Sequence, residues 1–311
     1  MTKAPGARPP EGKAGQVTVE ILLSATVIAD VSVTLPVLVM TLAYSRFRAG
    51  LMIPSRQGGD ILAGMWQLLS RIGAVTAKLV WDRESAIGGT GRPTVVATSF
   101  VGTLGTRLEL APPADPEYKG MVERNNRFFE TSFLPGRVFG SPADFNTQFE
   151  AWLTEHANTT RVRSIRARPI DLLAEDLAGM TLLPPVPPAT GICHRVRLAR
   201  DYYVRVAGND YSVDPTVIGR FVEVHHDLTT VTVTCAGQQV AVHARCWDQR
   251  RTITDPVHVA TAKTLRAAYR TQRATGRPTA RMAGEQVGQR PLSVYDDMFD
   301  LSSPRTDAQL E

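Results

Sequence analysis

The chain reads Val37-Leu38-Val39-Met40-Thr41-Leu42-Ala43-Tyr44 after an earlier apolar run, Val17-Thr18-Val19-Glu20-Ile21-Leu22-Leu23. Both runs are dense in Val, Leu and Thr, which is typical of buried β-strands. A third strand is predicted at residues 49–54, because Ser45-Arg46-Phe47-Arg48 fits an antiparallel hairpin turn before it. The N-terminal part of the chain therefore begins a sheet of at least three strands.

The stretch Ile21–Tyr44 is long enough to be compared with a membrane span. Asp30 places an acid inside it, and Pro36 lies near its middle. Consecutive buried strands explain this pattern better than a helix does, so no membrane partner is expected.

Four further elements follow the first three strands. Helical spacing of apolar residues predicts a helix over residues 60–72, and a second helix is expected at 94–104. Short strands are predicted at 78–81 and 107–110. Three strands, helix, strand, helix, strand, helix is the element order of a ribonuclease-H-like α/β domain.

Two carboxylates stand out beyond the first strands. Asp82 ends the apolar run Leu79-Val80-Trp81, and Glu123 lies in Lys119-Gly120-Met121-Val122-Glu123-Arg124-Asn125-Asn126, at the start of a predicted helix. Mg²⁺ prefers oxygen ligands and usually takes one or two protein carboxylates. Two such ions can stabilise the attacking and leaving oxygens of a phosphoryl displacement, so these acids point to nucleic-acid strand chemistry. Glu84 is interpreted as a surface acid.

The segment after this helix combines a capped helix with a basic run. Ser141 is a predicted N-cap with Pro142 at the first helical position, and a short helix is expected at 170–180. Between them, Arg161, Arg163, Arg166 and Arg168 form either a solvated face or a segment that follows DNA phosphates. Contacts of the second kind would position DNA and would not specify its sequence.

The periodicity changes after the stiff linker Pro184-Pro185-Val186-Pro187-Pro188. Short alternating strands are predicted at 196–198, 202–206, 210–213, 221–225, 229–235 and 238–245. They suggest a small all-β barrel, followed by a helix near 257–272. The predicted domains are a disordered or truncated leader (1–16), an α/β core with a helical extension (17–180), a linker (181–190), a β-barrel (191–250), and a helix with a polar tail (251–311).

The composition is globular, with 43% hydrophobic and 21% charged residues among 311. Thirty Arg stand against five Lys. Arg grips phosphate bidentately, so the bias suits nucleic acid, although a GC-rich genome gives the same bias. Three scattered Cys and no secretory leader favour a reducing cytoplasm.

Several of these motifs together resemble the catalytic core of IstA-type transposases of the insertion-sequence-twenty-one family, which are relatives of retroviral integrases and phage Mu transposase. The resemblance rests on Val37–Arg46, Trp81-Asp82-Arg83-Glu84 and Lys119–Arg124. It covers roughly residues 35–270 and includes four more segments, Phe133–Arg137, Ser141–Asn146, Arg200–Arg205 and Asp210–Pro215.

The resemblance implies an Asp-Asp-Glu enzyme that binds Mg²⁺ (or Mn²⁺), cleaves transposon ends and joins the freed 3′-hydroxyl to target DNA. Asp82 matches the second acid and Glu123 the third, while Lys119 and Arg124 would touch DNA phosphates. The implied partners are double-stranded DNA, an ATPase helper protein and further copies of the chain on DNA. The implied location is the bacterial cytoplasm, at the nucleoid.

Two departures from the family pattern leave the activity open. The first acid of the family is an Asp, whereas the matching strand here carries Glu20; Asp30 is a less favoured candidate because it lies too close to the next strand. The helix-turn-helix modules that precede the core in the family have no counterpart in the roughly sixteen residues before it. The alternatives are a catalytically inactive DNA-binding remnant and, with accidental motif matches, a non-nuclease α/β scaffold.

Overall fold

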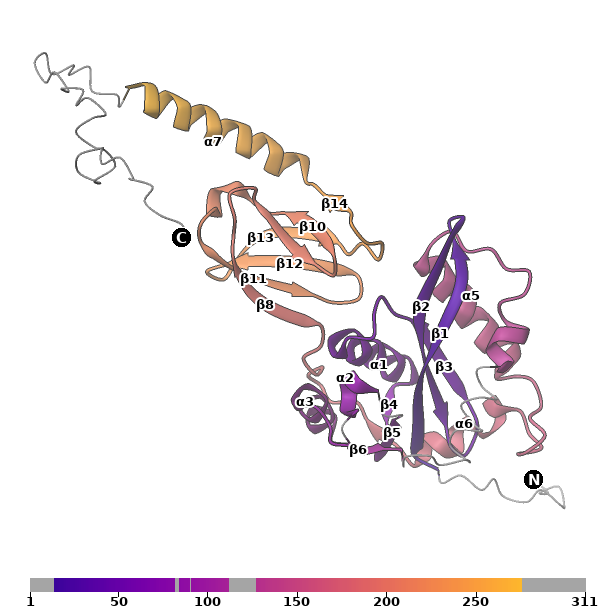
Figure 1. Cartoon of the computed structure of the whole chain (residues 1–311). Coiled ribbons are helices and arrows are strands. Elements are labelled where there is room, and N and C mark those ends of the chain that lie inside the picture. The colour runs from indigo at the N-terminus through magenta and orange to yellow at the C-terminus, as the bar shows by residue number, and fades with distance from the viewer. Residues whose placement is uncertain (1–13, 82–83, 90, 112–126, 276–311) are drawn as a thin grey trace, which may run out of the picture. The chain divides into compact units, whose positions relative to one another are not determined.

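The computed structural model describes residues 14–81, 84–89, 91–111 and 127–275. By its internal contacts the chain divides into two compact units, residues 1–262 and 263–311. The first unit contains all of the described strands (Figure 1).

A five-stranded mixed sheet forms the centre of the N-terminal part. Its strands lie in the order β3-β2-β1-β5-β6; β1, β2 and β3 are antiparallel, whereas β5 and β6 run parallel to β1. The bounds are β1 Gln16–Ile28, β2 Val31–Leu42, β3 Arg48–Met52, β5 Lys78–Trp81 and β6 Arg107–Leu110. This order and these directions define a ribonuclease-H-like sheet, so the predicted fold class is confirmed.

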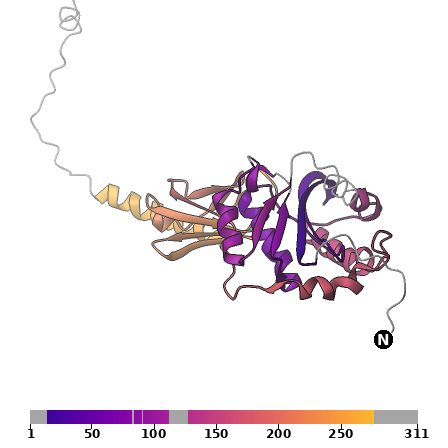
Figure 2. The ribbon, with the colours of Figure 1, turned by 90° about the horizontal axis from the view of Figure 1, so that it is seen from below.

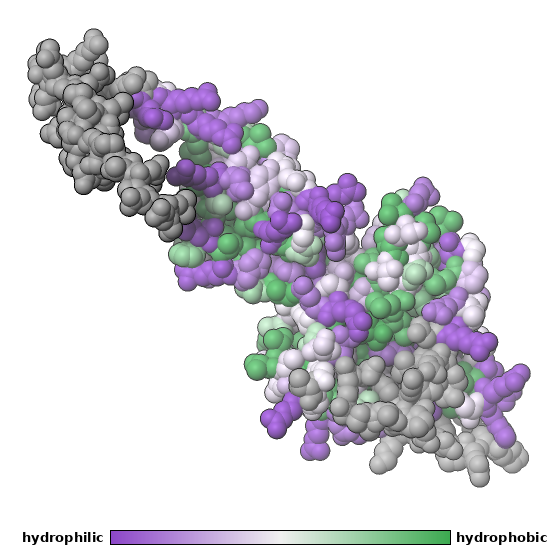
Figure 3. All heavy atoms as spheres, viewed as in Figure 1, coloured by the Kyte–Doolittle hydropathy of each residue, from purple (hydrophilic) through white to green (hydrophobic). Residues whose placement is uncertain are grey.

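The first two strands form a hairpin longer than the sequence predicted. The ladder runs from the pair Val17–Leu42 to the pair Ile28–Val31. Ala29 and Asp30 make the turn with φ values of 48° and 63°, which suits the two-residue turns of tight hairpins. The apolar stretch is thus strand, as expected, and no helix within the described ranges is long and apolar enough to cross a membrane. Apolar side chains remain exposed near the hairpin tip (Figure 3).

Helices cover both faces of this sheet (Figures 1 and 2). On one face lie α1 Gly58–Ile72, the short α2 Ser85–Gly88 and α3 Val95–Leu104. The predicted apolar face of α1 packs against β1 and β2 in one buried cluster. On the other face, α5 Pro142–Trp152, a helical segment at 127–132 and the connection between them contribute an aromatic cluster: Phe129, Phe133, Phe139, Phe145, Phe149 and Trp152.

The chain then passes through a π-helical turn, Leu153–Ala157, and α6 Pro169–Ala178. A short pair, β4 Ala74–Val75 with β7 Thr181–Leu182, returns it to the end of α1. The N-cap prediction is confirmed, because the Ser141 hydroxyl accepts a hydrogen bond of 3.1 Å from the Asp144 amide.

Seven short strands form the C-terminal part of the first unit. They are β8 Ile192–Arg197, β9 Tyr203–Val206, β10 Asn209–Ser212, β11 Phe221–His226, β12 Thr230–Cys235, β13 Gln238–Ala244 and β14 Thr252–Ile253. They pair as two sheets, β13-β12-β11-β8 and β14-β10-β9, around one apolar core. Strand pairing does not close into a full barrel in the part of the chain that the structure describes. Two bonds tie the end of β10 to β13: the Asp214 amide donates to the Val240 carbonyl, and the Nε2 of His243 donates to the Ser212 carbonyl at 2.6 Å.

A buried ion pair joins this β-region to the α/β core. Asp60, in the first turn of α1, accepts hydrogen bonds of 2.6 and 2.9 Å from the Arg245 guanidinium, which follows β13. Next to it, the indole of Trp247 donates a 3.0 Å bond to the Leu228 carbonyl. The 20-residue helix α7, Pro256–Thr275, leaves the β-region after β14.

Candidate active site

Glu20 is the one member of the predicted acid triad that the structure describes. It lies in the middle of β1, is only 3% exposed, and pairs with Val39 on β2. On its other side β1 pairs with β5 up to Val19–Trp81. Glu20 is therefore the position on β1 immediately after the last described β1–β5 pair, and Trp81 is the residue before Asp82.

The neighbours of Glu20 on its face of the sheet divide into a polar and an apolar end. At one end, Thr41 on β2 pairs with Thr18 on β1 and with Arg48 on β3. Leu22 and Met52 lie at the other end, within the aromatic cluster under α5. The Glu20 carboxylate therefore lies at the boundary between these polar neighbours and the apolar core.

Arg48 provides a cation beside this carboxylate. Burial lowers the pKa of Arg48, and electrostatic attraction to Glu20 acts in the opposite direction. Asn158 fixes the Arg48 backbone with two 2.9 Å bonds, one to the amide and one to the carbonyl. The guanidinium lies 5.1 Å from the ring centroid of Phe128, within the range of a cation–π contact.

These surroundings partly fit a divalent cation. A carboxylate with two threonine hydroxyls on the same face offers hard oxygen donors, which Mg²⁺ and Mn²⁺ accept. Arg48 opposes a cation at this place, so further carboxylates are needed to hold one. Within the described ranges no group of three or more His, Cys, Asp or Glu could hold a metal ion.

The remaining predicted site residues of the triad region, Asp82, Lys119, Glu123 and Arg124, lie outside the described residues. Asp30, the alternative first acid, is exposed in the hairpin turn. It is ten residues from Glu20 along a strand, or about 30 Å, so it does not belong to the same site. The role of Glu20 as the first acid stays a prediction.

Glu84 differs from its interpretation as a surface acid. Its side chain is buried and forms an ion pair with Arg56, which lies just before α1. Burial of a carboxylate requires such a partner. Arg56, in the connection between β3 and α1, supplies it to Glu84 at the start of α2. No local sequence pattern predicts this pairing, because the two residues are 28 positions apart along the chain.

The arginines of the basic run are exposed, but some of them already form hydrogen bonds or ion pairs within the chain. Arg161, Arg163, Arg166 and Arg168 are all exposed in a tight turn before α6. Arg168 forms a bidentate pair with Asp171, and the Arg161 side chain donates to the Arg166 carbonyl. Arg163 forms no hydrogen bond or ion pair in the part of the chain that the structure describes. A DNA contact by this run stays a prediction.

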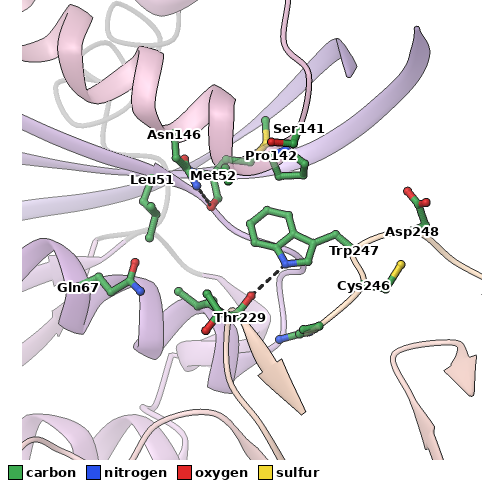
Figure 4. Close-up of a pocket in the computed structure, with 13 residues that line it drawn as sticks. Leu51, Met52, Gln67, Ser141, Pro142, Asn146, Thr229, Cys246, Trp247 and Asp248 are labelled. Carbon is green, nitrogen blue, oxygen red and sulfur yellow. Dashed lines mark hydrogen bonds between the residues drawn. The ribbon is translucent and has the colours of Figure 1, made fainter. Parts of the chain in front are cut away.

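A pocket that sequence reasoning missed lies between the α/β core and the β-region (Figure 4). Its volume is about 410 Å³, and its walls include Met52 and Asn146 on one side and Thr229 and Trp247 on the other. Asn146 is held by two bonds to the Met52 backbone, at 2.7 and 3.1 Å. The Trp247 ring points toward Met52 across this space (Figure 4). No local sequence pattern marks this pocket, because its walls come from segments that are far apart along the chain.

The chain is similar in sequence to known proteins. Residues 183–255 match the family model of the Mu transposase C-terminal domain, a range that contains strands β8 to β14. The transposase for insertion sequence element IS21 from Pseudomonas aeruginosa is 25% identical over 233 residues, which are 73% of this chain and 55% of that protein. The chain thus spans about half the length of this curated relative.

Two solved structures overlap the chain with low identity. The catalytic core domain of BIV integrase aligns with a TM-score of 0.37 and 16% identity, over 52% of this chain and 95% of that one. A simian T-cell lymphotropic virus intasome, in complex with PP2A regulatory subunit B56 gamma, aligns with a TM-score of 0.38 and 14% identity, over 81% and 86%. The fold assignment rests on the strand order and directions of this chain's own sheet. In sequence, the chain is a relative of IS21-type transposases, as its motifs predicted, and its β-region is similar to the C-terminal domain of Mu transposase.

Proposed function

We propose that the chain cleaves DNA strands and transfers them, as the catalytic part of a transposase with an Asp-Asp-Glu type site. The observation that carries this proposal is the position of Glu20, a buried carboxylate at the centre of β1. It lies beside the strand that leads into Asp82.

The strand register supports Glu20 and Asp82 as neighbours. If the parallel β1–β5 ladder continues by one residue beyond Val19–Trp81, it pairs Glu20 with Asp82. Adjacent strands lie about 4.8 Å apart, and paired residues point to the same face. Two carboxylates in this relation can share a cation, and Glu123 would complete the set.

In this proposal Glu20, Asp82 and Glu123 hold two Mg²⁺ or Mn²⁺ ions. When bound, the ions would stabilise the charge on the attacking and leaving oxygens of the phosphodiester. Lys119, Arg124 and the Arg161–Arg168 run would position duplex DNA through its phosphates. An ATPase helper protein and a homo-oligomer on the transposon ends follow from the family resemblance.

An inactive DNA-binding remnant is the second candidate, and two observations favour it. The first acid is Glu, whose extra methylene shifts the carboxylate, and a misplacement of about 1 Å can cost on the order of a hundredfold in rate. Arg48, moreover, supplies a positive charge next to that carboxylate.

A metal-dependent strand-transfer assay on element-end DNA separates the two candidates. We expect product with Mg²⁺ or Mn²⁺, and loss of at least a hundredfold in Glu20→Gln and in Asp82→Asn. Glu109→Gln is the matched control, because Glu109 is an exposed acid on β6 of the same sheet. No metal-dependent product from the unmodified chain would establish the remnant, and full activity of Glu20→Gln would remove Glu20 from the site.

A further inference from the structure

Helix α7 carries a stripe of positive charge that the strand-transfer proposal does not use. Its described basic residues are Lys263, Arg266, Arg270 and Arg273, and the helix contains no Asp or Glu. The spacings of three, four and three residues put all four on one helix face. Each of them is exposed, and hydrophilic side chains gather over this helix (Figure 3).

None of the four cations forms an ion pair within the described residues. Other exposed cations of the chain do have acidic partners, such as Arg71 with Glu150 and Lys78 with Glu109. Like charges three and four residues apart destabilise a helix. A stripe with no acid on its own helix and no ion pair within the described residues is therefore stabilised when an anionic polymer lies along it.

The rest of the helix surface favours nucleic acid over a lipid surface. Interfacial helices bury a broad apolar face in the membrane. Beyond Ala262, the large apolar side chains of the described helix are Leu265 and Tyr269, which are 41% and 62% exposed. The face opposite the basic stripe carries the small residues Thr264, Ala268 and Thr271. The stripe spans eleven residues, or about 15 Å along the helix axis, so it can meet several phosphates of one duplex.

We propose that Lys263, Arg266, Arg270 and Arg273 form a binding face for the phosphate backbone of duplex DNA. Binding at this face is independent of base sequence, because it consists of charge contacts alone. The inference rests on the proposed function in one respect, namely that DNA is the substrate. It assigns DNA contact to a helix that lies outside the α/β core and outside the basic run before α6.

The test measures binding of the full chain to a labelled duplex of arbitrary sequence as a function of salt concentration. Each phosphate contact contributes about −0.9 to the slope of log K against log salt. Replacing all four cations with Gln should make the slope shallower by about 3.6. Between 50 and 200 mM salt, the unmodified chain should therefore lose about a hundredfold more affinity than the variant does.

Three controls make the result specific. The charge-preserving variant with Arg266→Lys, Arg270→Lys and Arg273→Lys should keep the full slope. The paired variants Lys263→Gln/Arg266→Gln and Arg270→Gln/Arg273→Gln should each remove about half of the effect, and circular dichroism checks that α7 persists. If the four-Gln variant alone loses structure, these paired variants decide the outcome.

Two results would overturn the inference. One is an unchanged salt slope in every Gln variant. The other is a four-Gln variant that no longer binds anionic phospholipid vesicles but keeps the DNA affinity and salt slope of the unmodified chain. That result would assign the stripe to a membrane surface. Failure of the strand-transfer proposal can be told apart from failure of this one. If both proposals hold, Glu20→Gln abolishes the strand-transfer product without altering the salt slope. If the unmodified chain forms no product, the salt slope can still be measured.

Discussion

The buried pair between Asp60 and Arg245 gives the sharpest test of how the β-region is held against the α/β core. The two side chains are 0% and 1% exposed and share two hydrogen bonds. Asp60 also accepts a 2.5 Å bond from the Ser55 hydroxyl, and Arg245 donates at 2.6 Å to the Asp227 carbonyl. The Arg245 Nε finds no partner within the described residues, so the guanidinium depends strongly on the carboxylate.

Asp60→Ala should destabilise the chain by about 3–5 kcal/mol, because it leaves a buried guanidinium with one remaining acceptor. With a urea m-value of about 3 kcal/mol/M, the midpoint of unfolding would fall by about 1 to 1.7 M. The double variant Asp60→Leu/Arg245→Met should recover most of this loss, since replacing a whole buried pair with apolar side chains is often neutral.

Urea unfolding followed by Trp fluorescence measures the change, because Trp247 lies next to Arg245 at the same junction. The matched control is Asp171→Ala, which breaks the exposed pair between Arg168 (55% exposed) and Asp171 (45%). That control should cost less than about 1 kcal/mol. Equal costs for Asp60→Ala and Asp171→Ala, both below about 1 kcal/mol, would refute the reasoning from burial.

Three further predictions concern packing, pH and capping. Gly50→Ala should destabilise by about 1–3 kcal/mol in thermal unfolding, because an added Cβ would lie 2.4 Å from the Phe149 ring; a neutral result would contradict the tight packing of α5 on β3. Burial, followed by the charge of Arg245, lowers the pKa of His226 from 6.5 to about 4. The fold thus favours neutral His226, so its contribution to stability is fully present above about pH 6.5 and is lost as the pH falls toward 4. The free energy of unfolding measured over this range should drop by up to about 3 kcal/mol, and His226→Leu should flatten that part of its pH dependence. Ser141→Ala should cost about 1 kcal/mol in urea unfolding through loss of the α5 N-cap, and no loss would mean that Pro142 alone starts the helix.

The elements of the fold could be predicted from local patterns, and the joins between them could not. The apolar runs at 17–23 and 35–44 and the helical spacing over 60–72 predicted β1, β2 and α1, because burial imposes a period of two or 3.6 residues on the sequence. The hairpin turn at Ala29–Asp30 was missed, since the Asp within an apolar run was interpreted as an argument against a membrane helix and as a less favoured first acid, and not as a turn residue.

Long-range polar pairs account for most of what local patterns could not predict. Asp60 and Arg245 are 185 residues apart, and Arg56 and Glu84 are 28 apart. No periodicity connects such residues, because the chain topology alone brings them together. The same holds for the candidate site, where the motif located Glu20 on the first strand, but only the β1–β5 register relates it to the end of β5.

The charge around Glu20 explains why the fold alone does not decide between an active enzyme and a remnant. A carboxylate that is 3% exposed needs compensating charge, and Arg48 attracts it whether or not cations are bound. The sheet and the junction with the β-region involve other residues, so both would survive complete loss of catalysis. Comparing the unmodified chain with Glu20→Gln is therefore decisive. This substitution removes the negative charge of the side chain and keeps its shape, so it should abolish metal-dependent strand transfer in an active enzyme. In a remnant the same change would alter only stability, through the lost attraction to Arg48.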